Sequence, residues 1–331
     1  MSLGGPAAAG PNGLSGALAR MSSRFIVAVA QVSPAEDTAA ALVEIARQAQ
    51  AAAAGDAALI LFPEAYIGGY PRGSDFGAVV GSRSDAGREE FERYWRRAIE
   101  VPGPITDELG AIAAKNRLHI VVGVVERGGG TLYCTVVFLG PDGAYLGKHR
   151  KLMPTASERL IWGFGDGSTL PVLDTAIGRV GAVICWENYM PLLRAAMYAK
   201  GVEIYLAPTA DGRDTWLPTM RHIAMEGRCF VLSANQFACR SHYPEVHGAV
   251  DPADDAVVSP GGSCIVDPLG SVLAGPLFGQ SGLLMAEIDR GAIARSRFDF
   301  DPVGHYSRPD VFRLTVNELE QAPVVFERTD E

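Results

Sequence analysis

The sequence has few of the features that mark disulfide-stabilised or metal-binding proteins. Its 331 residues include only five cysteines, which lie far apart at positions 134, 185, 229, 239 and 264. Their number is odd, and no Cys-x-x-Cys pair or cysteine–histidine cluster occurs, which argues against a disulfide framework and against a structural zinc site. We therefore expect a reducing, cytoplasmic location and no metal.

Signals for nucleotides, membranes and nucleic acids are also missing. No Gly-x-Gly-x-x-Gly or Gly-x-x-x-x-Gly-Lys-[Ser/Thr] loop follows a strand-like run, so no nucleotide cofactor is expected. No uninterrupted apolar stretch reaches the ~20 residues of a membrane span. The net charge of −9 disfavours nucleic acid and anionic membrane surfaces as partners. These absences favour an enzyme that acts on small molecules.

The first 23 residues differ in composition from the rest of the chain. They are rich in Gly, Ala, Pro and Ser, with Arg20 as the one basic residue and no sustained apolar segment. Such a segment is a poor secretory signal and a poor transit peptide. We expect residues 1–23 to form a disordered leader and the folded chain to begin near Arg24.

From there on, apolar strand-like runs alternate with segments of helical spacing. The predicted strands cover residues 24–32, 58–63, 118–127, 132–140, 144–151, 179–185, 202–208, 229–237 and 283–290, with a hairpin at 262–275. The predicted helices cover residues 37–54, 88–100, 105–116, 191–201 and 214–228, with a short helix after the last strand. This order predicts an α/β fold with a mixed sheet whose apolar strands are covered by helices.

Cys185 stands where the apolar run RVGAVIC ends and the polar turn WENYMP begins. A free cysteine is most often a buried core residue, and we keep that interpretation for Cys134, Cys229 and Cys264, with Cys239 as a bystander in a loop. The position of Cys185 is different, because a residue between the carboxyl end of a parallel strand and the next helix faces the ligand-binding crevice of an α/β sheet. Nearby helix amides would favour its thiolate.

A nucleophilic thiol needs a base, and histidine is the usual one. The six histidines lie at positions 119, 149, 222, 242, 247 and 305, none in a recognisable protease pattern. His222 and Glu226 have the i, i+4 spacing of a helix-surface pair.

Two other strand ends carry charged residues. Glu64 follows a buried strand and a proline, where a loop carboxylate and a crevice carboxylate are equally plausible. Lys151 ends the basic run 148–151, which is typical of a solvated face, but apolar Leu152 and Met153 follow and can turn its stem inward. Glu64, Lys151 and Cys185 together would supply an acid/base, a charge stabiliser and a nucleophile without histidine.

Three long segments in this order, FPEAYIGGYPRG, HRKLMPTASER and GAVICWENYMP, resemble the signature segments of the nitrilase (carbon–nitrogen hydrolase) superfamily. The CWEN sequence resembles the true nitrilase branch, as do residues 161–172, 205–216 and 222–237. The resemblance implies one carbon–nitrogen hydrolase domain over residues 24–300, followed by a tail, 301–331, at an oligomer interface. It implies an α-β-β-α sandwich that becomes four-layered in a homodimer or in a larger, spiral homo-oligomer.

The resemblance also implies roles for four residues. Glu64 would be the general base, Lys151 the stabiliser of the tetrahedral intermediate, Cys185 the nucleophile and Glu158 a second glutamate that orients the site. The reaction implied is hydrolysis of an organic nitrile to a carboxylic acid and ammonia through a thioimidate and an acyl-enzyme, without metal or cofactor. The substrate is open among aliphatic, aromatic and arylacetonitriles, with a lean towards the last two.

Alternatives to the nitrilase hypothesis are an amidase-type or cyanide-hydrolysing member of the same superfamily, a binding protein with an inert site, and a redox-thiol protein. The last is disfavoured because no resolving cysteine lies near Cys185 in the sequence. Trp186 is equally a pocket wall and a core residue, and its backbone N–H is a candidate oxyanion donor. For Tyr70, Trp162 and the 209–216 loop, substrate binding is a candidate role and packing is favoured. Asn188 is predicted to cap the helix that follows.

Overall fold

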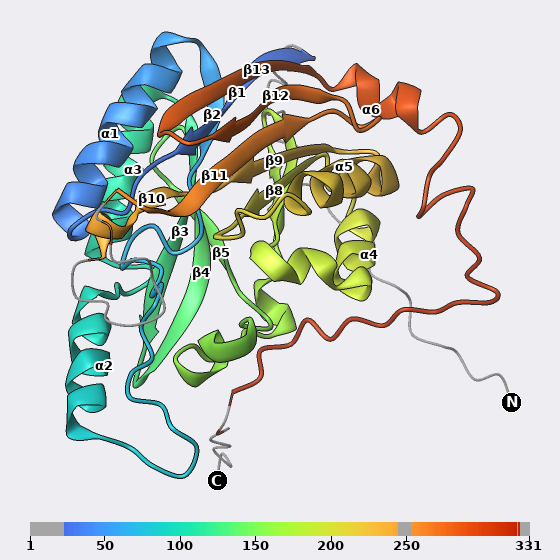
Figure 1. Ribbon diagram of the computed structural model, residues 1–331. Helices are drawn as coiled ribbons and strands as arrows, with labels where there is room; N and C mark the ends of the chain where they lie inside the picture. Colours follow the sequence, from blue (N-terminus) through green and yellow to red (C-terminus); the bar gives the residue numbers. More distant parts are fainter. Residues whose placement is uncertain (1–22, 244–252, 254, 323, 325–331) are drawn as a thin grey trace, which may run out of the picture.

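The computed structural model describes residues 23–243, 253, 255–322 and 324 (Figure 1). The predicted leader, residues 1–23, lies outside the described residues except for Ser23, and His247 lies outside them as well.

The first sheet has six strands in the described part of the chain. In spatial order they are β13 (Gly282–Asp289), β1 (Arg24–Gln31), β2 (Ala57–Leu61), β3 (His119–Gly128), β4 (Thr131–Leu139) and β5 (Tyr145–Arg150). β1, β2 and β3 pair in parallel, while β13, β4 and β5 join through antiparallel ladders. The carboxyl ends of β2 and β5 therefore lie at the same edge of this sheet.

The second sheet has the order β10 (Phe237–Cys239), β11 (Val257–Val266), β9 (Phe230–Ala234), β8 (Ile204–Pro208), β7 (Gly178–Ala182) and β6 (Val172–Thr175), and β12 (Val272–Phe278) also pairs with β11. β7, β8 and β9 are parallel. Their carboxyl ends form a second edge of the kind at which α/β proteins place their sites.

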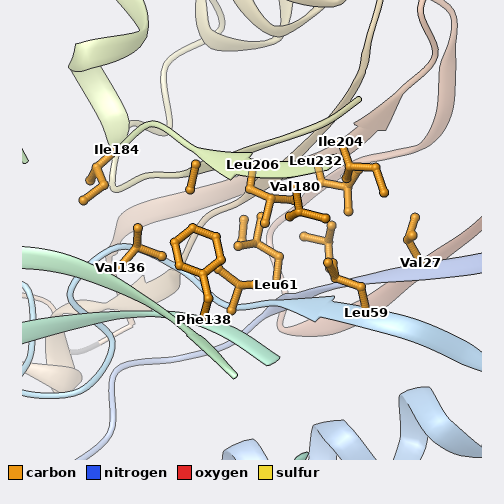
Figure 2. Close-up of a cluster of buried hydrophobic side chains, with 14 of the residues drawn as sticks. Val27, Leu59, Leu61, Val136, Phe138, Val180, Ile184, Ile204, Leu206 and Leu232 are labelled. Carbon is orange, nitrogen blue, oxygen red and sulfur yellow. The ribbon is translucent and has the colours of Figure 1, made fainter. Parts of the chain in front are cut away.

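The two sheets pack face to face, and the largest apolar cluster fills the space between them. Figure 2 shows Leu61 and Phe138 of the first sheet pointing towards Val180 and Leu206 of the second. Side chains alternate between the faces of a strand, and both faces of central strands such as β2, β8 and β9 are buried, so the middle of each sheet is covered on both sides.

Helices cover the two outer faces. α1 (Thr38–Ala54) and α3 (Pro104–Asn116) pack on the first sheet, and α4 (Pro191–Ala199) and α5 (Trp216–Gly227) pack on the second (Figure 1). α2 (Asp85–Arg97) and the short α6 (Gly291–Ser296) lie at the periphery. The predicted α-β-β-α sandwich is confirmed.

The boundaries of α1 show how local sequence sets an element. The side chain of Asp37 accepts a hydrogen bond from the backbone N–H of Ala40 at 2.8 Å, which caps the first turn. Ala41, Ile45 and Ala49 then face the sheet at helical spacing, and Gly55 ends the helix. This helix was predicted almost to the residue because both ends carry local signals.

Two predicted strands end early. The run 229–237 divides into β9 and β10 because polar groups interrupt the ladder: the N–H of Asn235 donates to the hydroxyl of Ser263, and the N–H of Gln236 donates to the Asn235 side chain. The run 179–185 ends as β7 at Ala182, and Cys185 opens the 3-10 helix η3 (Cys185–Tyr189). The short edge strand β6 was not predicted from the sequence.

The chain beyond α6 extends along the outside of the molecule without helix or strand up to residue 322 (Figure 1). Its apolar side chains, among them Phe312 and Leu319, are exposed. The segment is fastened to the body where the N–H of Gln321 donates to Asp166 at 2.8 Å and where Lys200 pairs with Glu318. Within the described residues, no helix combines the length and the apolar character needed to cross a membrane.

Candidate active site

Strand ends from both sheets supply the candidate residues. Glu64 lies three residues beyond β2, Lys151 directly follows β5, and Cys185 lies three residues beyond β7. The sandwich places these ends against one another, so residues far apart in the sequence meet in one buried cluster.

A glycine in β3 allows Glu64 to approach the sheet. A β-carbon on Gly123 would lie 2.3 Å from the carbonyl oxygen of Pro63 and 2.7 Å from the α-carbon of Glu64. The N–H of Gly123 donates to that same carbonyl at 3.1 Å. Any larger residue at position 123 would push the Glu64 segment away from the site.

Lys151 lies between two carboxylates. Its Nζ is 2.7 Å from Oε1 of Glu64 and 2.7 Å from Oε2 of Glu158, and all three side chains are buried. Burial by itself lowers the pKa of Lys151, but the negative charge of Glu64 and the other acidic groups around it raise that pKa well above its usual value. Lys151 is therefore an ammonium ion, and its stem does turn inward.

Hydrogen bonds fix the orientation of Glu158, which lies in the 3-10 helix η1 (Ala156–Leu160). The hydroxyl of Tyr70 donates to its Oε1 at 2.7 Å, and the N–H of Thr155 donates to its Oε2 at 2.6 Å. Trp162 is buried and contacts Tyr70 edge-on, with the ring centroids 5.9 Å apart. The Nζ of Lys151 lies 5.7 Å from the centroid of the Trp162 ring. Trp162 thus supports the cluster from behind.

Cys185 has an unusual backbone conformation. Its φ is +51°, in the left-handed region that non-glycine residues rarely occupy, and strain of this kind is often found at functional sites. The hydroxyl of Thr209, the residue after β8, donates to its Sγ at 3.1 Å. The prediction that Asn188 caps α4 is wrong, because its side chain is buried and donates to the carbonyls of Val183 and Cys185. Asn188 instead fastens the turn that carries the thiol.

Electrostatics assign a proton to the thiol. Burial raises the pKa of Cys185, and the nearby carboxylate of Glu64 raises it further, while Lys151 and the hydrogen bond from Thr209 oppose the shift. Burial also raises the pKa of Glu64, against the effect of Lys151. The thiolate expected from the sequence is therefore not the resting form, because desolvation outweighs the nearby cation. A carboxylate with a raised pKa is well suited to take the thiol proton.

The two carboxylate oxygens of Glu64 differ in their hydrogen bonding. Oε1 accepts from Lys151 and from the thiol of Cys134, whose Sγ is 3.5 Å away. Oε2 is buried and has no hydrogen-bond partner among the described residues. The Cys185 thiol lies close enough to this carboxyl group to lower the pKa of Glu64. The arrangement leaves Oε2 available for a proton from Cys185 or from water.

A cavity of about 380 Å³ opens onto this cluster. Cys185, Glu158, Tyr70 and Trp186 are among its lining residues, and Glu64 and Lys151 are buried behind them. Its other lining residues are Arg72, Thr155, 210–213 and 258–260.

Trp186 is 40 % exposed and forms one wall of the cavity. Its Nε1 donates to Asp211 at 2.8 Å, and the guanidinium of Arg213 lies 4.6 Å from its ring while it also pairs with Asp211. Of the two interpretations of Trp186, the pocket wall agrees with the structure and the core residue does not. Tyr70 both lines the cavity and packs.

The basic run 148–151 is not the solvated face that its composition indicates. Lys148 and Arg150 lie on one face of β5 and pair with the buried Glu126, while His149 and Lys151 point to the other side and are buried. His149 contacts Glu187 rather than the thiol. His222 and Glu226 form the expected pair on α5, with Nε2 and Oε1 3.6 Å apart.

Three residues make contacts in the site that were not predicted from the sequence. Cys134 was assigned to the core; it is buried, as predicted, yet its thiol also reaches Glu64. Thr209 and Glu187 lie inside segments that were noted, residues 205–216 and the CWEN sequence, but no pattern in the sequence specifies their partners. Among the described residues, no group of three or more His, Cys, Asp or Glu side chains is arranged to hold a metal ion.

Comparison with known families identifies the class of protein. Residues 26–298 match the model of the carbon–nitrogen hydrolase family. The chain belongs to that family.

Curated relatives are similar over most of the chain. The chain is 56 % identical over 298 residues to "Bifunctional nitrilase/nitrile hydratase NIT4B" of Nicotiana tabacum, covering 88 % of this chain and 86 % of that protein. It is 54 % identical over 296 residues to "Nitrilase 1" of Arabidopsis thaliana, with 88 % and 86 % covered.

Solved structures support the fold. The NitFhit protein of C. elegans is similar with a TM-score of 0.69 at 20 % identity, covering 91 % of this chain and 69 % of that one. An amidase of the nitrilase superfamily from Nesterenkonia gives a TM-score of 0.61 at 21 % identity, covering 83 % and 94 %.

Proposed function

We propose that this chain is a nitrilase, which hydrolyses an organic nitrile to a carboxylic acid and ammonia with Cys185 as the nucleophile. The observation that carries the proposal is the meeting of a buried thiol, a carboxylate with one open oxygen and an ammonium ion next to one cavity. Relatives 54–57 % identical that are named nitrilase or bifunctional nitrilase/nitrile hydratase support a nitrile substrate.

The first step is the attack on the nitrile carbon. Glu64 Oε2 takes the proton of the Cys185 thiol as the sulfur adds to the carbon of R–C≡N, and the protonated Glu64 then gives this proton to the nitrile nitrogen and is a carboxylate again. The product is a thioimidate, R–C(=NH)–S–Cys. A general base beside the thiol is needed because burial keeps Cys185 protonated at rest.

Water completes the reaction in two additions. Glu64 activates the first water, which adds to the thioimidate and gives a tetrahedral intermediate whose negative charge is stabilised by Lys151, with the N–H of Trp186 as a further candidate donor. Ammonia leaves and a thioester remains, and a second water releases R–COOH and restores the thiol. The sum is R–C≡N + 2 H₂O → R–COOH + NH₃. Glu158 holds Lys151 in place from its other side.

The same tetrahedral intermediate has a second way to collapse. If the C–S bond breaks in place of the C–N bond, the product is the amide R–CO–NH₂ and the thiol is regenerated without a thioester. The relatives named bifunctional nitrilase/nitrile hydratase support a fraction of amide product here as well. The amide-to-acid ratio is the quantity that describes this partition.

The experiment is a product analysis on a panel of phenylacetonitrile, benzonitrile, 3-phenylpropionitrile, an aliphatic dinitrile, cyanide and the matching amides. We expect ammonia and acid from at least one organic nitrile, with Cys185→Ala inactive and Glu64→Gln slowed on the order of 10²-fold or more. Ammonia mainly from amides would move the protein to the amidase branch, and ammonia from cyanide alone would make it a cyanide hydrolase. Turnover by Cys185→Ala would overturn the nucleophile.

We propose in addition that the chain works in the cytoplasm as a homodimer or a larger, spiral homo-oligomer, with one hydrolase domain over residues 24–300. The exposed apolar side chains of the tail, such as Phe312 and Leu319, support an interface there. Sedimentation of the full chain and of a chain ending at residue 300 tests this, because loss of the tail should lower the oligomer size.

A further inference from the structure

Glu187, two residues after the nucleophile, is a buried carboxylate that the proposed reaction does not use. Its Oε1 accepts a hydrogen bond from the backbone N–H of Leu152 at 2.6 Å, and its Oε2 accepts one from the backbone N–H of Ile184 at 2.9 Å. Leu152 follows Lys151, and Ile184 precedes Cys185. One side chain thus joins the backbones that carry the ammonium and the thiol.

His149 completes this connection. Its Nε2 lies 3.0 Å from Oε2 of Glu187, and its Nδ1 lies 2.5 Å from the carbonyl oxygen of Thr169. Both partners are acceptors, so both ring nitrogens donate and the imidazole is charged. Burial by itself lowers the pKa of His149, but the charge of Glu187 and its hydrogen bond raise it above the usual value. The pair is a fully buried salt bridge.

We propose that Glu187 and His149 are positioning residues, which hold the β5 segment bearing Lys151 against the turn bearing Cys185 and so fix the distance between ammonium and thiol. This inference rests on the proposed function of Lys151 and Cys185. It concerns contacts between two sheets, since β5 belongs to the first and the turn follows β7 of the second.

Three donors converge on Glu187, and this number explains why a carboxylate is needed. The N–H of Leu152, the N–H of Ile184 and the imidazolium of His149 all point at its two oxygens. A glutamine offers one oxygen and turns its NH₂ group towards at least one of these donors. Glu187→Gln therefore breaks the connection while nearly preserving side-chain volume.

Glu126, on β3 of the sheet that contains β5, provides a matched control. It is buried and accepts from Lys148, Arg150 and Thr135, so it too is a carboxylate on which three donors converge. Those partners all lie on β4 and β5, and none belongs to the turn of Cys185. Glu126→Gln should cost stability in a similar way without loosening the contact between the two sheets.

The experiment compares Glu187→Gln with Glu126→Gln by kcat and KM and by melting temperature. It also compares the pH profiles of Cys185 alkylation by iodoacetamide, with Cys185→Ser as the blank. A misplacement of about 1 Å can cost about 10²-fold, so we expect Glu187→Gln to lower kcat by about that factor with KM nearly unchanged. Glu126→Gln should keep the wild-type kcat although both variants melt earlier.

The alkylation profile reports the position of Lys151 directly. Lys151 lowers the pKa of the Cys185 thiol, so a loosened Lys151 segment should shift the profile of Glu187→Gln towards higher pH. A shift of half a unit makes alkylation roughly threefold slower at a fixed pH below the pKa. The charged and titratable groups that act on the thiol, and that stay in place in this comparison, are Glu64, Glu158, Tyr70 and Arg213.

Two substitutions of His149 give a finer test and serve if Glu187→Gln does not fold. In His149→Gln the side-chain amide lies near the former Nε2 and still donates to Glu187. In His149→Asn it lies near the former Nδ1 and keeps only the bond to Thr169. We expect His149→Asn to lose more kcat and to shift the alkylation profile further than His149→Gln.

The proposal is overturned if Glu187→Gln only melts earlier while its kcat and alkylation profile stay at the wild-type values. It is also overturned if Glu126→Gln loses kcat by the same factor as Glu187→Gln. A third contradicting result is a loss of kcat in His149→Gln as large as that in His149→Asn. Alkylation does not depend on the substrate. Failure of the nitrilase proposal would therefore be seen as missing nitrile turnover in the wild type, separately from any change in thiol reactivity.

Discussion

Replacing Lys151 by methionine removes the one positive charge between two buried carboxylates. Each carboxylate oxygen is 2.7 Å from Nζ. At an effective dielectric constant of ~20, Coulomb's law gives about 6 kcal/mol of attraction for each pair, most of which is cancelled by the cost of desolvating the charges. Breaking a buried pair by removal of one partner typically costs about 3–5 kcal/mol. In a chain of this size we expect the melting temperature of Lys151→Met to fall by roughly 5–10 °C near pH 8.

The loss should depend on pH in a defined direction. Without Lys151, the pKa of Glu64, which burial already raises, should rise further. A carboxyl whose folded pKa exceeds its unfolded pKa contributes stability that is present at low pH and is lost as pH rises through the folded pKa. The difference in melting temperature between wild type and Lys151→Met should therefore be larger at pH 8 than at pH 5.

The assay is differential scanning fluorimetry across pH 5–8, together with nitrile turnover. We expect kcat to fall on the order of 10²-fold or more, because Lys151 stabilises charge in the transition state. Equal melting differences at pH 5 and pH 8 would show that the two carboxylates do not depend on Lys151 for their charge. Turnover at the wild-type rate would refute its role as charge stabiliser.

Three further substitutions test the surroundings of the thiol. Tyr70→Phe removes one hydrogen bond to Glu158, typically worth about 1 kcal/mol, and should lower kcat roughly fivefold in a steady-state assay, whereas no change would show that Tyr70 only packs. Thr209→Val removes the hydroxyl that donates to Cys185 and opposes the rise of its pKa, so iodoacetamide labelling should move to higher pH, and an unchanged profile would contradict this. Asn188→Ala removes two buried hydrogen bonds, to the carbonyls of Val183 and Cys185, and should cost about 1–3 kcal/mol in urea unfolding, whereas an unchanged unfolding midpoint would contradict its role in fastening the turn.

The sequence predicts the fold and the cluster well where the signal is local. Glu64 and Cys185 each follow an apolar run, Lys151 follows the strand β5 of a predicted hairpin, and the ends of these strands meet at the edges of the sheets. Local patterns therefore place these positions at strand ends, whereas the roles of Glu64 and Lys151 in the site were predicted from the resemblance to the nitrilase superfamily. β6 was not predicted because the segment Val172–Thr175 contains no long apolar run, as its residues are not fully buried at the edge of the sheet.

Contacts between residues of the two different sheets cannot be predicted from local sequence patterns. Residues 148–151 look like one basic patch, yet the two-residue period of β5 sends Lys148 and Arg150 to Glu126 and buries His149 and Lys151 on the other face. Which acidic group each one meets depends on how the two sheets dock. The same holds for the protonation of Cys185, since the extent of its burial is a property of the folded core.

The most direct test of the account is intact-protein mass spectrometry of the enzyme quenched with acid during turnover of a nitrile, followed by peptide mapping and paired with ammonia release by Cys185→Ala. The account predicts a covalent adduct on the peptide that contains Cys185, with the mass of the nitrile or of its acyl group, and no ammonia from the variant. An adduct on a different residue, or ammonia release by Cys185→Ala at the wild-type rate, would contradict it.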